Sequence, residues 1–127
     1  MKYLLDTNAL IGFLYKPDFL SVAAKNILEN EDSLYVSIVS LWEIGIKQSI
    51  GKIDIITKSS EIAKTCEEYN IALIPILPSE IDDMKTLPPI HKDPFDRLLV
   101  SQARMNAMTL ITKDTVIPQY PDVLTVW

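Results

Sequence analysis

The stretch KYLLDTN, Lys2–Asn8, is a short apolar strand that runs directly into an acidic residue. The same arrangement recurs after Leu34–Ser37, where Glu43 follows within a few residues, and after Thr109–Thr112, where Asp114 follows. Short apolar strands separated by amphipathic helical stretches predict a parallel sheet with helices on both faces. We therefore expect an α/β protein with a three-layer α/β/α fold and a central parallel sheet.

Hydrophobic periodicity predicts the order of the elements. Strands are expected near Lys2–Leu5, Leu34–Ser37, Ala72–Ile74, Thr109–Thr112 and Val123–Val126. Helices are expected over Ser21–Asn30, Leu41–Ile50, Ser59–Tyr69, Ser79–Leu87 and Phe95–Asn106, with Gly51 ending the helix that carries Glu43. A chain of 127 residues suits a single domain, spanning residues 1–127.

Four acidic residues, Asp6, Glu43, Asp96 and Asp114, lie where a strand ends or a helix begins. Ligands of open parallel sheets bind outside the carboxyl ends of the strands, so we expect these acids to converge there. Clustered carboxylates repel one another unless a cation neutralises them, and oxygen ligands without Cys or His select Mg²⁺ or Mn²⁺. Such a site can activate water for displacement at phosphorus, so phosphodiester hydrolysis is the predicted reaction.

Each of these acids also has a purely structural interpretation. Ser40-x-x-Glu43 reads as a capping box. Asp93 before a proline reads as a helix cap, which places Asp96 in the first turn, where the helix dipole favours a carboxylate. Asp6 would cap a helix beginning near residue 8, and Asp114 would form a turn. The shared strand-end position of the four acids favours the metal site, whereas Asp93 is left to capping.

Four segments together resemble a known family. They are Leu4–Asn8, Val36–Ile44, His91–Ala103 and Leu110–Asp114, and they look like a PIN domain, more narrowly the VapC toxins of bacterial toxin–antitoxin pairs. The block His-x-Asp-Pro-Phe-Asp-Arg at His91–Arg97 is the most specific part of the match.

The resemblance implies a Mg²⁺- or Mn²⁺-dependent endoribonuclease that leaves 3′-hydroxyl and 5′-phosphate ends. It implies that Asp6, Glu43, Asp96 and Asp114 are the catalytic and metal-binding residues. It also implies a cognate VapB-like antitoxin and a homodimer. One departure is Asn8, where many relatives of this subgroup have His.

Several polar residues near these acids have two interpretations. Thr7, Asn8, Ser40 and Thr112 would hydrogen-bond the carboxylates, or would only satisfy backbone groups at helix starts. Arg97 would contact a substrate phosphate, or would form an intramolecular ion pair.

Other residues near the predicted site are expected to play surface or packing roles. His91, with no second His or Cys beside it, is expected on a loop surface and not as a proton shuttle. Lys47, Lys92 and Lys113 would flank an RNA path but are expected to be solvated. Trp42 is expected in the core and not as a platform for base stacking.

Composition limits the function classes. The chain is 48% hydrophobic and 23% charged, and its net charge is −5. This charge argues against a broad basic face for nucleic acid, so RNA affinity would come from bound metal and a local cationic rim. The single Cys66 permits no internal disulfide and is expected in the core. No export signal or membrane segment is visible, and we expect a cytoplasmic protein.

Two alternative functions remain open at this stage. A receiver-type phosphoacceptor domain would need an acidic pair after the first strand, but Asp6 is followed by Thr7, and Asp54 lies outside any expected strand. A PIN-like domain that binds metal and a partner without cleaving RNA keeps the same acids. Apolar residues early in the chain either pack on the sheet or form a groove for an antitoxin helix or a dimer partner: Leu10, Ile11, Phe13, Leu14 and Tyr15.

Overall fold

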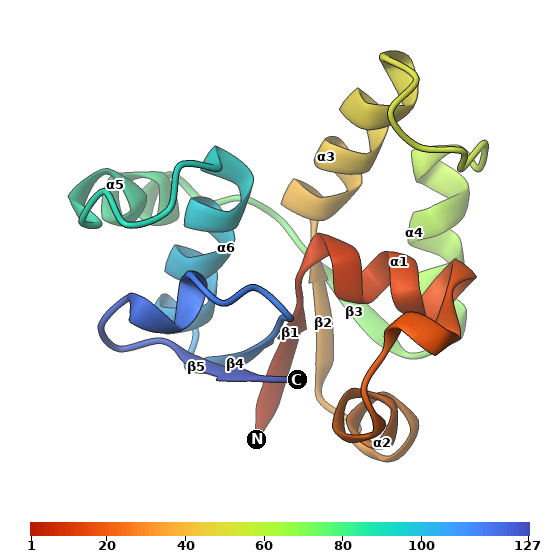
Figure 1. The fold of residues 1–127 in the computed structure, drawn as a ribbon, viewed down its shortest axis with the longest axis horizontal. Coiled ribbons are helices and arrows are strands. Elements are labelled where there is room, and N and C mark those ends of the chain that lie inside the picture. The colour runs from red at the N-terminus through yellow and green to blue at the C-terminus, as the bar shows by residue number, and fades with distance from the viewer.

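The computed structural model describes residues 1–127 and has a central sheet of five parallel strands in the order β3-β2-β1-β4-β5 (Figure 1). The strands are β1 (Lys2–Leu5), β2 (Leu34–Ser37), β3 (Ile71–Ile74), β4 (Met108–Ile111) and β5 (Leu124–Val126). The helices are α1 (Thr7–Tyr15), α2 (Val22–Asn30), α3 (Ile38–Ser49), α4 (Ser59–Glu68), α5 (Pro78–Thr86) and α6 (Pro94–Met105), with short 3-10 turns η1 (Pro17–Phe19) and η2 (Ile117–Gln119). None of the helices is long and apolar enough to cross a lipid bilayer.

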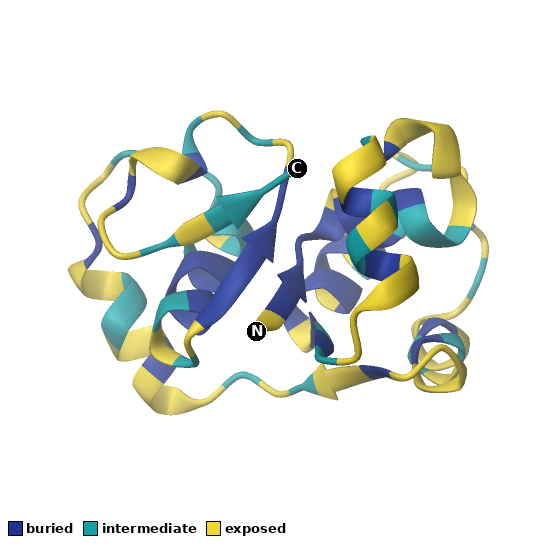
Figure 2. Ribbon diagram, turned by 90° about the horizontal axis from the view of Figure 1, so that it is seen from below, coloured by how far each residue is buried: buried dark blue, intermediate teal, exposed yellow.

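The sheet separates two hydrophobic cores, and alternation along β1 shows how. Tyr3 and Leu5 pack with helices α1 to α4 on one face, whereas Leu4 packs with α6 on the other. Successive side chains of a strand point to opposite faces, so a strand buried on both faces is apolar throughout. The central strands are accordingly buried (Figure 2). The expected three-layer α/β/α fold with a parallel sheet is confirmed.

Helix α3 begins three residues earlier than the sequence predicted. Its cap is Ser37, whose side chain accepts a hydrogen bond from the Val39 N–H at 3.0 Å. The predicted Ser40-x-x-Glu43 capping box is therefore wrong, because Ser40 lies inside the helix. At the other end, Gly51 has a φ of 70° just beyond the helix, as its predicted role requires.

The carboxyl ends of β1 and β4 lie side by side. Leu5 is paired with Ile111, and the Asp6 N–H donates to the Ile111 carbonyl at 3.1 Å. The chain builds β2 and β3 on one side of β1 and then β4 and β5 on the other. Beside β1 the strand order therefore reverses, and ligand sites of open α/β sheets lie at such a reversal.

Candidate metal centre

Asp6 follows β1 and is only 4% exposed. Its Oδ1 accepts a hydrogen bond from the Ala9 N–H at 2.7 Å and so caps α1. The predicted cap is present, but it occupies one oxygen of the carboxylate. The Thr112 side chain also hydrogen-bonds this carboxylate, which is one of the two roles expected for Thr112. The cap uses only one lone pair of the carboxylate, so capping and cation binding are compatible at this residue.

Glu43 reaches the same region from the buried face of α3. The Thr7 hydroxyl donates to Glu43 Oε1 at 2.7 Å, and Thr7 and Ser40 hydroxyl oxygens are 3.0 Å apart. Because the one Thr7 proton goes to Glu43, Ser40 donates to Thr7. Lys47 Nζ lies 2.8 Å from Glu43 Oε2, so the expectation that Lys47 is merely solvated is wrong.

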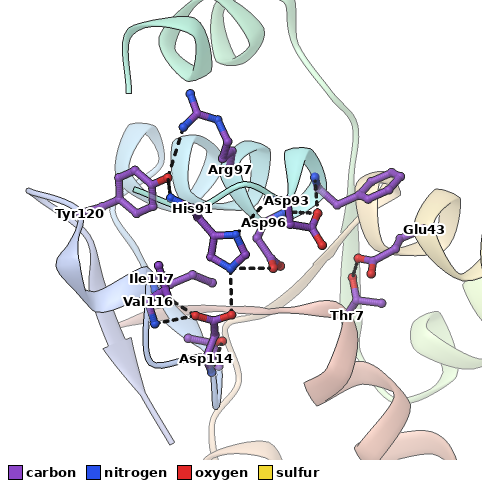
Figure 3. Close-up of polar contacts among 12 residues, drawn as sticks. Thr7, Glu43, His91, Asp93, Asp96, Arg97, Asp114, Val116, Ile117 and Tyr120 are labelled. Atoms are coloured by element: carbon purple, nitrogen blue, oxygen red, sulfur yellow. Dashed lines mark hydrogen bonds and ion pairs between the residues drawn. The ribbon is translucent and has the colours of Figure 1, made fainter. Parts of the chain in front are cut away.

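Asp96 enters from the first turn of α6. Asp93 caps this helix, as predicted, with Oδ1 accepting from the N–H groups of Phe95 at 2.8 Å and Asp96 at 3.3 Å. The cap fixes the helix start and holds the Asp96 side chain toward the sheet edge (Figure 3).

Asp114 lies two residues beyond Thr112, which follows β4. The Asp114 N–H donates to Thr112 Oγ1 at 3.1 Å, and Asp114 Oδ1 accepts from the N–H groups of Val116 at 2.7 Å and Ile117 at 3.0 Å. The predicted turn role is therefore present. It uses Oδ1 and leaves Oδ2 facing His91, 2.9 Å from its Nε2.

The carboxylates perturb one another. Burial raises the pKa of Asp6 to about 6; hydrogen bonds at the carboxylate oppose this shift, and the charges of Glu43 and Asp114 add to it. Burial likewise raises the pKa of Asp96 to about 7, and the negative charge of Asp93 is the next cause. Burial is thus the main reason that both acids resist ionisation, and the neighbouring carboxylates add to it. A cation bound at these carboxylates would favour their ionised forms.

Asp114 is perturbed in the opposite direction. Burial alone would raise the pKa of Asp114, but hydrogen bonds from His91, Ile117 and Val116 hold it below its ordinary value. The cluster therefore contains one acid kept ionised by its hydrogen bonds beside two that resist ionisation.

His91 is the residue whose role the sequence misplaced. It was expected on a loop surface, yet its side chain is only 14% exposed and its Nε2 lies 3.3 Å from Asp96 Oδ2 and 2.9 Å from Asp114 Oδ2. These three residues bring one potential ligand atom each within 4.8 Å of one another. The sequence feature that could have indicated this position is that His91 lies two residues before Asp93, the cap of α6.

Three further expectations are corrected. Arg97 contacts no acid; its guanidinium donates to the carbonyls of Pro88 at 3.0 Å, Met84 at 3.2 Å and Leu87 at 3.3 Å, and so holds the loop before α6. The Asn8 side chain is exposed and makes no hydrogen bond to the acids. Trp42 is 55% exposed, and its ring packs edge-on against Phe95, so the core assignment is wrong.

The donor set fits a hard divalent cation. Asp96 and Asp114 bring potential ligand oxygens within 4.8 Å of each other, and Asp6 and Glu43 are close enough for their charges to act on pKa values in the cluster. Asp6, Asp96 and Asp114 each have an oxygen not used in capping a helix or turn. Mg²⁺ and Mn²⁺ are bound by one or more such carboxylates while keeping several waters.

Fold and acidic centre together define an α/β/α domain with a carboxylate cluster at the point where the strand order reverses. Residues 3–123 match the PIN domain family, and the chain belongs to that family. It is 28% identical over 127 residues to ribonuclease VapC22 of Mycobacterium tuberculosis, covering 98% of this chain and 97% of the relative.

Solved structures share the same fold. VapBC2 from Rickettsia felis, bound to a DNA fragment from its promoter, superposes with a TM-score of 0.68 at 17% identity, over 99% of this chain and 98% of that one. A toxin–antitoxin complex from Klebsiella pneumoniae gives a TM-score of 0.66 at 18% identity, over 98% and 97%. At these identities the likeness concerns the fold alone.

Proposed function

We propose that this chain is a metal-dependent endoribonuclease that hydrolyses RNA phosphodiester bonds and is the toxin of a toxin–antitoxin pair. The observation that carries the proposal is the cluster of four interacting carboxylates, in which Asp6 and Asp96 have raised pKa values. Membership of the PIN family and the likeness to a VapC ribonuclease support RNA as the substrate. Residues 1–127 act as one such domain.

Asp6, Glu43 and Asp96 would hold the principal Mg²⁺ or Mn²⁺, and Asp114 would complete the set. A bound divalent ion supplies positive charge for the developing phosphorane and lowers the pKa of water. The protein contributes orientation: Thr7 fixes Glu43 Oε1, and Lys47 holds Oε2. Donors preset in a buried site need no rearrangement during the reaction.

A cationic hollow beside the acids supports an RNA path. Lys47, Lys52 and Lys92 line a cavity of about 360 Å³, together with the acids Glu43 and Asp93 and the ring of Phe95. Phosphates flanking the scissile bond would lie along these lysines, because RNA affinity depends on neutralising backbone charge. The local rim thus provides cations that the overall composition lacks.

A separate apolar cavity fits an antitoxin segment. It measures about 610 Å³ and lies between α1, η1 and the strap formed by residues 53–57. Gln48 fixes the strap by donating to the carbonyls of Ile55 at 2.9 Å and Thr57 at 2.8 Å. Ile11 and Tyr15 line this groove, whereas Leu10 is buried in the core. We assign the groove to a VapB-like antitoxin.

An apolar stripe on α3 fits a second copy of the chain. Ile38, Trp42 and Ile46 recur every four residues, each at least 36% exposed, and with Leu73 they border a hollow of about 500 Å³. Contiguous exposed apolar surface of this kind marks protein interfaces. We assign this stripe to the homodimer.

The test is metal-dependent cleavage. Antitoxin-free protein is incubated with total bacterial RNA in Mg²⁺ or Mn²⁺, and every new 5′ end is sequenced. Discrete cuts that require metal and disappear with EDTA or in Asp96→Asn support the proposal; Asp82→Asn, which removes an exposed carboxylate, serves as the matched control. Metal binding without any cuts would instead favour the inactive partner-binding domain.

A further inference from the structure

The His91 side chain stands between two acids of the centre. Its Nε2 is 2.9 Å from Asp114 Oδ2 and 3.3 Å from Asp96 Oδ2 (Figure 3). Asp114 comes from the loop after β4, whereas Asp96 comes from α6. The imidazole therefore links α6 to the loop after β4.

The tautomer of His91 follows from its other ring nitrogen. The backbone nitrogen of Asp93 lies 3.0 Å from His91 Nδ1. A backbone N–H can only donate, so Nδ1 accepts and the ring proton is on Nε2. Nε2 is therefore a hydrogen-bond donor toward the carboxylates. While this arrangement holds, it has no lone pair for a metal ion, although its position alone would suit a ligand.

The backbone of His91 is fixed as well. Its N–H donates to the Tyr120 hydroxyl at 2.7 Å, and Tyr120 is only 3% exposed. Arg97 Nη1 donates to the same hydroxyl at 3.3 Å and to the Pro88 carbonyl at 3.0 Å. Hydrogen bonds thus fix both the backbone and the ring of His91. A fixed side chain can in turn orient the carboxylates that it contacts.

The hydrogen bond from His91 also determines which electron pairs of Asp114 remain free. Oδ1 already accepts from Val116 and Ile117, which uses both of its lone pairs. Oδ2 accepts from His91, so one lone pair is left. Because the Nε2–H donor is fixed, the remaining lone pair of Asp114 Oδ2 points in one defined direction.

We propose that His91 is a positioning residue of the metal centre, a neutral Nε2–H donor that orients Asp114 and holds Asp96 beside it. The inference rests on the proposed function, because it assigns His91 a role toward the cation. In metalloproteins, carboxylate ligands are oriented by residues that hydrogen-bond to them. Loss of such a residue weakens metal binding by about 10- to 100-fold.

Three variants distinguish the role of His91 Nε2 from the role of His91 Nδ1. His91→Gln keeps a donor near the position of Nε2. His91→Asn keeps an acceptor near Nδ1 for the Asp93 N–H but is too short to reach the acids. His91→Ala keeps neither. Mn²⁺ affinity is measured by calorimetry on the full chain after EDTA treatment, and circular dichroism and urea titration check that each variant folds.

We expect His91→Gln to bind Mn²⁺ within about threefold of wild type, and His91→Asn to bind about 10- to 100-fold more weakly. His91→Ala should resemble the Asn variant; if it fails to fold, the Gln and Asn pair decides. Equal affinity for His91→Asn and wild type would overturn the positioning role, as would equally weak binding by the Gln and Asn variants.

Pulsed electron paramagnetic resonance of bound Mn²⁺ gives an independent readout. We expect no hyperfine coupling from a directly coordinated ¹⁴N of His91, and such a coupling in wild type that vanishes in His91→Gln would make His91 a ligand and overturn the inference. A wild-type protein that binds no Mn²⁺ would overturn the proposed function as well. RNA cleavage that needs Mn²⁺ but is indifferent to His91→Asn would overturn only the positioning role.

Discussion

Replacing Asp96 by Asn should stabilise the metal-free protein. The pKa of Asp96 is raised from 3.8 to about 7, mainly by burial and next by the charge of Asp93. About three pKa units at 1.36 kcal/mol each amount to about 4 kcal/mol by which ionised Asp96 opposes folding at high pH. Its side chain is 19% exposed, so solvent screens this cost little. Asn has nearly the same shape and carries no charge.

The sign of the pH dependence follows from the raised pKa. Below pH 3.8, Asp96 is protonated in the folded and the unfolded protein and does not lower the free energy of unfolding. As pH rises from 3.8 through 7, the unfolded protein loses this proton more readily, so the free energy of unfolding falls. The gain in Asp96→Asn should therefore grow from about 2 kcal/mol at pH 5 to about 4 kcal/mol at pH 8. Metal should offset this gain, because Mn²⁺ at about 100 Kd adds about 2.7 kcal/mol to the free energy of unfolding of a protein that binds it. This exceeds the difference at pH 5 and reduces the difference at pH 8 to about 1 kcal/mol.

Urea titrations followed by circular dichroism at pH 5, 6, 7 and 8, with chelator present, measure these differences. Asp82→Asn is the control, since the Asp82 side chain is 75% exposed and its loss should leave the pH profile unchanged. A stability gain in Asp96→Asn that is independent of pH, or a loss of stability at pH 8, would refute the charge argument and favour a role for Asp96 in holding the start of α6.

Three shorter predictions concern other parts of the fold. Ala107 is exposed with a φ of 53°, so Ala107→Gly should raise the free energy of unfolding by about 1 kcal/mol in urea titrations; no gain would contradict the strain. Buried Glu80 accepts from Gln102 at 3.0 Å, so Glu80→Ala should cost about 3 kcal/mol by the same assay, and a neutral result would contradict it. Trp42→Glu should convert a dimer to a monomer in light scattering, and an unchanged mass would remove the α3 stripe as the interface.

The parallel sheet could be predicted because its strands are short, apolar on both faces and separated by helical periodicity. The acids at the strand ends could be predicted for the same reason: in a parallel sheet those ends share one edge. Capping and clustering looked like competing explanations for Asp6 and Asp114. They coexist, because the hydrogen bonds from backbone amides go to Oδ1 in both residues, and Asp114 Oδ2 faces His91 at the centre.

The contacts of His91 and Arg97 could not be predicted, because they depend on how separate elements fold against one another. The pair of Glu43 and Lys47 is different: the two residues lie four apart on α3, so helical spacing alone would have predicted their contact. His91 meets Asp114, 23 residues away, only once the loop before α6 has folded over β4. Arg97 could have paired with an acid or a phosphate, but it donates to three carbonyl groups at the end of α5 and in the loop that follows. Sequence spacing therefore predicts which residues lie at the carboxyl edge of the sheet. Which of these side chains contact one another depends on how the loops fold.

The acidic net charge is consistent with an RNA substrate once the charges are placed in the fold. The chain has seventeen acids and twelve lysines and arginines; without the four acids of the centre, thirteen acids face twelve bases. Most of the excess negative charge therefore lies in the one site where a divalent cation would neutralise it. With that site filled, the remaining surface is nearly neutral, and Lys47, Lys52 and Lys92 set the local field at its border. RNA binding should then depend on the metal first and on bulk salt only weakly, because few phosphates are neutralised by the protein itself.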